Sequence, residues 1–209
     1  MGRIICLMGK SSTGKDTIFK RLLAEKELGL KNIVSYTTRP IREGEQNGAE
    51  YFFTDEAGYQ QWKEQGKIIE DRVYHTVHGL WRYFTVNDGQ LQDERQNYIL
   101  IGTLEAYRML LDYFGRDRLL PILIEVDDGI RLQRALQREL AQAHPRYEEM
   151  CRRFLADSKD FSEEKIKEAG TIKRVANQNL EDCLEEIRAY IGSEISGAQG
   201  KEAGIWRLR

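Results

Sequence analysis

Three residues near the N-terminus, Gly9, Gly14 and Lys15, have the GxxxxGK spacing of a loop that binds phosphate. An apolar run, RIICLM, precedes the loop, and DTIFKRLLAEK follows it with apolar residues at helical spacing. In this context glycines let backbone N–H groups point inward, the helix adds its positive end, and the lysine neutralises phosphate charge. The pattern therefore predicts a site for ATP or a close analogue, which also includes Ser11, Ser12, Thr13, Asp16 and Thr17.

Asp16 stands where such a loop usually carries serine or threonine. A polyphosphate repels a carboxylate unless a cation lies between them, and Mg²⁺ is the natural cation because it prefers oxygen ligands. Thr17 offers a hydroxyl at the next position. The same aspartate is well suited to cap the helix N-terminus. The two roles are compatible, and the sequence predicts a metal site at Asp16 and Thr17.

A second stretch, SYTTRPIREGEQNGAEYFF at 35–53, has the chemistry to bind a monophosphate. Arg39 and Arg42 can each present a planar guanidinium to phosphate oxygens, and Ser35 and Tyr51 supply hydroxyl donors. A surface loop with Arg–Glu pairs is the alternative interpretation. The neighbouring phosphate loop favours a binding site.

The spacing of apolar residues indicates the elements that position these groups. Continuous apolar runs suit parallel strands buried on both faces, and they occur at 3–8, 32–36, 97–102, 119–126 and 171–176. The fold class is therefore α/β. Residues 37–96 interrupt this rhythm and predict an inserted lobe of short strands, with a helix from Thr54 or Asp55 to Gly66.

A second insertion is helical, with a break at His144-Pro145. The last helix is expected at about 180–191, and the composition of 192–209 predicts a flexible tail whose Trp206 could dock.

Composition limits the classes of function. The chain has 209 residues, enough for one sizeable core, and a formal net charge of -2, which gives no reason to expect a nucleic-acid partner. No apolar run is long enough to span a membrane. The three cysteines, Cys6, Cys151 and Cys183, are far apart, so we expect a reduced, cytoplasmic setting.

The segment 35–53 resembles the GMP-binding segment of guanylate kinases, with Ser-x-Thr-Thr-Arg-Pro, Arg, Gly-Glu, Asn-Gly and Tyr-x-Phe at the same spacing. Together with the phosphate loop, the resemblance extends in outline over 1–191. It implies a P-loop NTPase three-layer fold with a five-stranded parallel sheet. The implied parts are a core (1–36, 97–130 and 164–191), a mixed α/β GMP-binding lobe (37–96) and a helical lid (131–163).

The resemblance also implies an activity: ATP-dependent phosphorylation of GMP with Mg²⁺, by a monomer or a homodimer. Use of dGMP stays open. Two alternatives remain. One is a related kinase with another acceptor, such as ribose 1,5-bisphosphate, because a GKD phosphate loop also occurs there. The other is a non-catalytic guanylate-kinase-like binding module, although such modules generally lose the phosphate loop that this chain keeps.

Residue roles follow from the match. In the GMP-binding segment the resemblance implies that Glu45 holds the arginines, and in GKIIEDRVY it matches Glu70 to a glutamate that recognises guanine. A carboxylate can accept from N1–H and the N2 amino group of guanine, whereas adenine offers it a lone pair. The implied acceptor-binding residues are Ser35, Arg39, Arg42, Glu45, Tyr51, Glu70, Tyr83 and Thr85.

The helical lid carries arginines that, in the family, close over the phosphates. Arg131, Arg134 and Arg138 share one helical face, and Arg138 and Arg153 are the best positional matches. Lys15 and these two arginines are therefore the implied catalytic residues, since phosphoryl transfer depends on positioning and charge neutralisation. Asn177 matches a family asparagine beside the adenine of ATP.

One departure stands out. Guanylate kinases usually end the third core strand in two aspartates, where this chain has Ile101 and Thr103. We hypothesise that Asp16 replaces a lost carboxylate at the metal from the loop side. Glu125 and Asp127, at the end of the next strand, are a competing source of that carboxylate.

Overall fold

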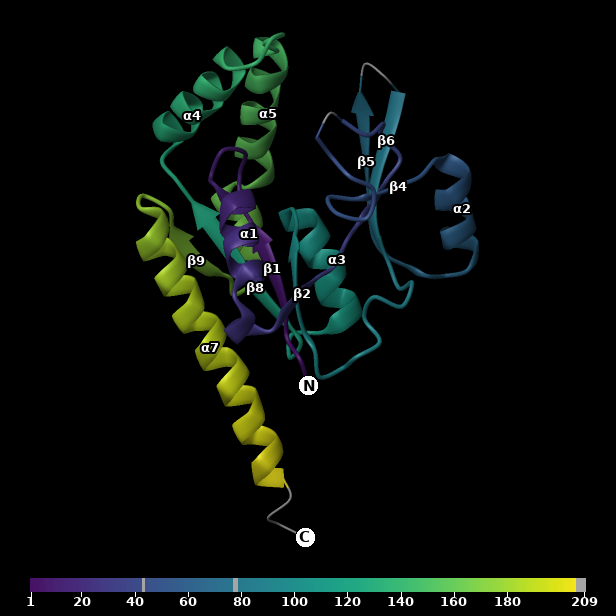
Figure 1. The fold of residues 1–209 in the computed structure, drawn as a ribbon, viewed down its shortest axis with the longest axis vertical. Coiled ribbons are helices and arrows are strands. Elements are labelled where there is room, and N and C mark those ends of the chain that lie inside the picture. The colour runs from purple at the N-terminus through teal and green to yellow at the C-terminus, as the bar shows by residue number, and fades with distance from the viewer. Residues whose placement is uncertain (43, 77–78, 206–209) are drawn as a thin grey trace.

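The computed structural model describes residues 1–42, 44–76 and 79–205. Its centre is a five-stranded, fully parallel sheet in the order β2-β7-β1-β8-β9 (Figure 1). The strands are β1 (Ile4–Met8), β2 (Leu30–Asn32), β7 (Asn97–Ile101), β8 (Leu119–Glu125) and β9 (Lys173–Ala176). The predicted α/β class and five-stranded parallel sheet are confirmed.

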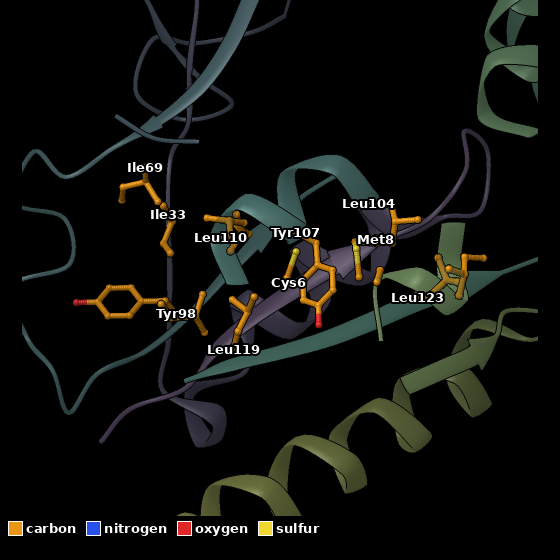
Figure 2. Packing of buried hydrophobic residues seen from close by; sticks show 14 of the residues in the cluster. Cys6, Met8, Ile33, Ile69, Tyr98, Leu104, Tyr107, Leu110, Leu119 and Leu123 are labelled. Carbon is orange, nitrogen blue, oxygen red and sulfur yellow. The ribbon is translucent and has the colours of Figure 1, made fainter. Parts of the chain in front are cut away.

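Helices cover both faces of this sheet because successive side chains of a strand point to opposite sides. Ile5 and Leu7 of β1 pack with residues of α1 (Lys15–Ala24) and α7 (Leu180–Ile205). Cys6 and Met8 of β1 face the other side, where Tyr107 and Leu110 of α3 (Leu104–Phe114) cover them (Figure 2). The result is the three-layer core that the resemblance implies.

The second predicted strand, 32–36, is wrong in its position. The core strand β2 ends at Asn32, and the chain then leaves for a second sheet that begins with β3 (Tyr36–Thr37). The amide of Ile33 still donates to Ile99 O at 3.0 Å, whereas Ser35 O accepts from Phe52 N at 2.9 Å. One continuous apolar run thus crosses between two sheets, and its composition does not reveal the crossing.

The second sheet forms the predicted lobe of short strands and a helix. Its order is β4-β3-β6-β5, with β4 (Phe52–Phe53), β5 (Ile68–Thr76) and β6 (Gly79–Val86). Helix α2 (Glu56–Glu64) begins where expected, because the Asp55 side chain caps it by accepting from Gly58 N at 2.8 Å. Tyr59, Phe84 and Val86 form the lobe's own small core.

The predicted helical insertion and its break are also present. Helices α4 (Asp128–Leu140) and α5 (Tyr147–Asp160) lie on either side of His144-Pro145, and α6 (Glu163–Glu168) leads back to the core. A short 3-10 helix, η1 (Lys26–Leu28), follows α1. In Figure 1 the helices α4 and α5 and the β5–β6 lobe lie toward the same end of the central sheet.

The end of the last helix differs from the prediction. Helix α7 continues to Ile205, so its expected end at about 191 is wrong, while the flexibility expected for 192–209 stays a prediction. Residues 192–205 contain glycines but no proline, and a helix already anchored by Leu184, Ile187 and Ile191 can extend through them. Trp206 lies outside the described residues. None of the described helices has the length and apolarity required to cross a bilayer.

Candidate functional site

The loop between β1 and α1 has a backbone shaped for phosphate. Gly14, the N-cap of α1, has φ 85°, and Ser12 has φ 64°, the one positive φ among the described non-glycine residues. A Cβ on Gly9 would come within 2.8 Å of Ile124 O. The Ser12 hydroxyl is buried and has no hydrogen-bond partner among the described residues. An unpaired buried hydroxyl in a strained loop is a feature that a bound polyphosphate would explain.

Asn177, which directly follows β9, holds this loop by a side-chain hydrogen bond. Its Nδ2 donates to Thr13 O at 2.8 Å, and its own amide donates to Glu125 O at 2.8 Å. A Cβ on Gly14 would come within 2.6 Å of the same Nδ2. The side chain therefore fixes the phosphate loop, while the predicted contact with adenine stays a prediction.

Two lid arginines, Arg138 and Arg153, lie near enough to Lys15 to act on its pKa. Burial lowers the pKa of Lys15, Arg153 and Arg138 lower it further, and Asp16 and Asp157 act in the opposite direction. Nη2 of Arg153 also donates to the Ser11 hydroxyl at 3.1 Å. The structure thus brings together the three residues to which the sequence assigns catalysis, and their combined positive charge suits a polyphosphate.

Two lid residues to which the sequence analysis assigned no individual role, Arg131 and Asp157, hold the loop. Arg131 is buried, and its Nε donates to Ser11 O at 3.0 Å. Asp157 accepts from Ser11 N at 2.6 Å and lies 3.3 Å from Nη2 of Arg131. The backbone N–H and C=O of the same loop residue, Ser11, are therefore both bonded to the lid. Arg131 carried a sequence signal as part of the arginine face, whereas Asp157 carried none.

Asp16 and Thr17 lie exposed in the first turn of α1. The N-cap is Gly14 and no side chain caps this end, so the capping role suggested for Asp16 is wrong. The competing carboxylates are engaged elsewhere: Glu125 accepts two bonds from Arg174, at 2.9 and 2.6 Å, and Asp127 caps α4. A carboxylate and a hydroxyl beside the loop lysine are oxygen donors of the kind that Mg²⁺ binds together with phosphate oxygens.

In the lobe, Arg39 is held by Glu45. The Arg39 side chain is only 3% exposed, and its two terminal nitrogens lie 2.7 and 2.6 Å from the Glu45 carboxylate. Glu45 also accepts from Arg42 N at 2.8 Å, and the hydrogen bond from Arg39 keeps the pKa of Glu45 below its usual value. The ring of Tyr51 lies 5.2 Å from the guanidinium of Arg39. The predicted arginine-holding role of Glu45 agrees with this geometry.

Glu70 is buried at the centre of a polar cluster. Its carboxylate accepts from the Thr85 hydroxyl at 2.7 Å, and the Ser35 hydroxyl lies 3.0 Å from that of Thr85. The sequence predicts Ser35 at the acceptor phosphate, but this bond places it in the Glu70 cluster, at the end where a base would lie. The pairing of β5 with β6 puts Thr85 opposite Glu70 and Tyr83 opposite Arg72, which accounts for the spacing of Tyr83 and Thr85 along the chain.

Arg72 joins the lobe to the core, and sequence reasoning missed it. Its Nε donates to Glu70 at 3.0 Å, and its Nη1 lies 3.5 Å from the hydroxyl of Thr103, the N-cap of α3. Burial alone would lower the pKa of Arg72, but Glu70 and the nearby Tyr74 and Tyr51 more than offset that effect, so the pKa is raised. The spacing Glu-x-Arg within one predicted strand could have revealed this arginine, because residues two apart on a strand project from the same face and can contact each other.

Comparison with known proteins places this arrangement in a family. The family model described as guanylate kinase matches residues 1–79. The guanylate kinase of Mesomycoplasma hyopneumoniae (strain J) is 30% identical over 202 residues, which cover 93% of this chain and 96% of that protein. The chain belongs to the guanylate kinase family.

Other guanylate kinases agree with this assignment. The protein from Porphyromonas gingivalis is 28% identical over 199 residues, covering 94% of this chain and 100% of that relative. The crystal structure of guanylate kinase from Anaplasma phagocytophilum superposes with a TM-score of 0.62 at 21% identity and covers 92% of this chain and 86% of that one. At that identity the structural likeness supports the fold.

Proposed function

We propose that this guanylate kinase family member transfers the γ-phosphoryl group of ATP to GMP, giving ADP and GDP. Two neighbouring features carry the proposal. One is a phosphate loop with strained backbone that ends in Lys15, and the other is a second site that contains Arg39 and Glu70. The two sites supply what the two substrates need: a cradle for a triphosphate, and an arginine and a carboxylate for a nucleoside monophosphate. Both substrates and the free cysteines fit a cytoplasmic enzyme of nucleotide metabolism.

The acceptor end binds by charge and by hydrogen-bond pattern. Arg39, held by Glu45 and flanked by Tyr51, is oriented to meet the GMP phosphate before it arrives, so little side-chain freedom is lost on binding. Arg42 adds a second guanidinium from the same exposed loop. Glu70 accepts from N1–H and N2–H of guanine, with Thr85 and Ser35 fixing the carboxylate.

The donor end neutralises and aligns the triphosphate. The loop from Gly9 to Thr17 surrounds it, Lys15 contacts its outer phosphates, and Asn177 keeps the loop rigid through Thr13. Arg138 and Arg153 come from the lid. An oxygen of the GMP phosphate attacks the γ-phosphorus, and the bond from that phosphorus to the bridging oxygen of ADP breaks. The lysine and arginines stabilise the charge on the group in transit, so no general base is required.

Asp16 and Thr17 are the residues that would hold Mg²⁺ together with the triphosphate. When bound, the ion would neutralise part of the negative charge of the triphosphate. We further propose three functional parts with the boundaries expected from the sequence: a core of 1–36, 97–130 and 164–191, an acceptor lobe of 37–96, and a lid of 131–163. Closure of lobe and lid on the core would exclude water from the transfer.

The test is ADP release by the purified protein with ATP and Mg²⁺, measured in parallel with GMP, dGMP, AMP, CMP, UMP and ribose 1,5-bisphosphate. Turnover confined to GMP and dGMP is the expected result. Turnover with ribose 1,5-bisphosphate instead, or ATP binding without turnover of any acceptor, would contradict the proposal in favour of another kinase or a non-catalytic module. A Lys15→Met variant controls for contaminating kinases and should be inactive.

A further inference from the structure

A buried arginine lies beside the carboxylate assigned to the acceptor base. Glu70 and Arg72 stand two apart on β5 and therefore project from the same face, with side chains 1% and 10% exposed. Taking two charges out of water is costly, and such a pair adds little stability over apolar side chains of similar size. Stability alone therefore does not account for an arginine at this position.

The hydrogen bonds of Arg72 differ in length. Nε donates to Glu70 Oε2 at 3.0 Å, a normal length, whereas Nη2 lies 3.4 Å from Glu70 Oε1 and Nη1 lies 3.5 Å from Thr103 Oγ1. The two long contacts exceed the usual range of N–H···O bonds. The terminal nitrogens can therefore exchange these contacts for better acceptors while Nε stays on the carboxylate. The guanidinium is anchored through Nε, and its other nitrogens make only long contacts with Glu70 and Thr103 besides a hydrogen bond with the Tyr74 side chain.

Guanine offers matching acceptors. Its N1–H and N2–H donors lie next to O6, and O6 and N7 together form the pair of acceptors that an arginine binds with two parallel bonds. Along β5, the carboxylate of Glu70 is followed by the guanidinium of Arg72, so an acceptor is followed by donors. This order is complementary to that of guanine, in which the N1–H and N2–H donors are followed by the O6 and N7 acceptors. Adenine reverses it, since its 6-amino group would face the arginine and its N1 lone pair would face the carboxylate.

We propose that Arg72 is a specificity-determining residue that donates to O6 and N7 of guanine while Glu70 accepts from N1–H and N2–H. This inference rests on the proposed function, because it takes the acceptor to be GMP. Glu70 then contacts the Watson–Crick edge of the base and Arg72 contacts its Hoogsteen edge, and selection against AMP comes from both residues. The bond to Thr103 links the base site to the first turn of α3 in the core.

The decisive probe is 7-deaza-GMP, which lacks only the N7 acceptor. The full-length protein should favour GMP over 7-deaza-GMP by roughly tenfold in kcat/KM, mainly through KM, because one charge-assisted bond is lost. Arg72→Met should lower kcat/KM for GMP and accept both nucleotides about equally. Arg82→Met is the matched control, since Arg82 on β6 pairs with Glu56 at 2.8 Å and lies over the Tyr59 ring; its preference should equal that of the wild type.

Several outcomes would overturn the inference. If wild type accepts the two nucleotides equally, Arg72 makes no N7 contact, and this result needs no variant to fold. If Arg72→Met keeps the wild-type ratio, the arginine only positions Glu70. Calorimetric binding of both nucleotides without ATP separates this inference from the proposed function. Binding of GMP without turnover would contradict the transfer reaction alone, and absence of GMP binding would contradict both.

Discussion

The pair between Arg39 and Glu45 gives a prediction whose size follows from burial. Glu45→Gln keeps the shape of the side chain but removes its charge and turns one acceptor oxygen into a donor that faces Arg39. The guanidinium, 3% exposed, then loses the carboxylate that lies 2.6 and 2.7 Å from its terminal nitrogens. A buried cation is left without its counter-charge, and the amide of Arg42 loses the charge on its acceptor.

The expected cost lies between two limits. Removing one partner of a fully buried ion pair costs about 3–5 kcal/mol, whereas exposed pairs contribute roughly 0–1 kcal/mol. Arg39 is buried but the Glu45 side chain is 17% exposed, so water partly compensates for the loss. We therefore expect a loss of about 2–3 kcal/mol in the free energy of unfolding. For a chain of this size that corresponds to a fall in Tm of roughly 5–10 °C.

The assay is thermal unfolding with and without GMP, alongside the KM for GMP. Because Glu45 holds Arg39 in place for the acceptor phosphate, KM for GMP should rise in Glu45→Gln, and GMP at a fixed concentration should raise Tm less in this variant than in wild type. Glu50→Gln is the control, since Glu50 is a loop carboxylate that accepts from Gln46 N at 2.9 Å. If both variants unfold within about 0.5 kcal/mol of wild type, the pair does not hold Arg39 and the reasoning fails.

The same pair sets a pH dependence. The pKa of Glu45 is lowered in the folded protein from its ordinary value of 4.5, chiefly by the hydrogen bond from Arg39. Its contribution to stability is therefore complete above pH 4.5 and is lost as the pH falls through the folded-state pKa. The stability difference between wild type and Glu45→Gln should be constant near neutrality and shrink in acid. A difference that stays constant at low pH would argue against this linkage.

Three further predictions concern the donor side. Asp16→Ser should raise the Mg²⁺ concentration needed for half-maximal activity, whereas Asp182→Ser, an exposed acidic residue in the first turn of α7, should not; equal Mg²⁺ dependence would reject a metal role for Asp16. Gly14→Ala should weaken ATP binding by roughly tenfold, because its Cβ displaces the Asn177 side chain from Thr13. Gly29→Ala, at φ 57° with open space around it, reports the backbone strain alone, and equal ATP affinity in the two variants would count against the clash. Asp157→Asn should speed hydrogen exchange in α5 by roughly tenfold without nucleotide, unlike Asp160→Asn; unchanged exchange would mean that the bond to Ser11 N does not hold the lid.

The parts of the site that the sequence predicted are local in the chain. The phosphate loop occupies nine consecutive residues between a strand and a helix, so spacing alone indicates its chemistry. Arg39 and Glu45 also lie in one short segment. By contrast, the run at 32–36 holds residues of two different sheets, and no local pattern marks where the chain crosses between them.

The parts that it could not predict depend on contacts between distant elements. Asp157 contacts Ser11, 146 positions away in the chain, and Arg72 contacts Thr103, 31 positions away, so neither pair has a sequence signature.

The contact of Arg72 also concerns the two carboxylates that the family usually has at the positions of Ile101 and Thr103. At Thr103 the structure has a hydroxyl that caps α3 and faces a guanidinium, so Glu70 sits beside a positive charge. In the proposed base site an arginine therefore lies near one position where the family usually has a carboxylate, and its donors would suit the acceptor atoms of guanine. On the donor side, Glu125 and Asp127 are engaged, which leaves Asp16 as the carboxylate free to meet a metal ion. Under the two proposals, the departures from the family pattern are met at separate places: a guanidinium would face the acceptor atoms of guanine, and a carboxylate would face the metal ion that accompanies the triphosphate.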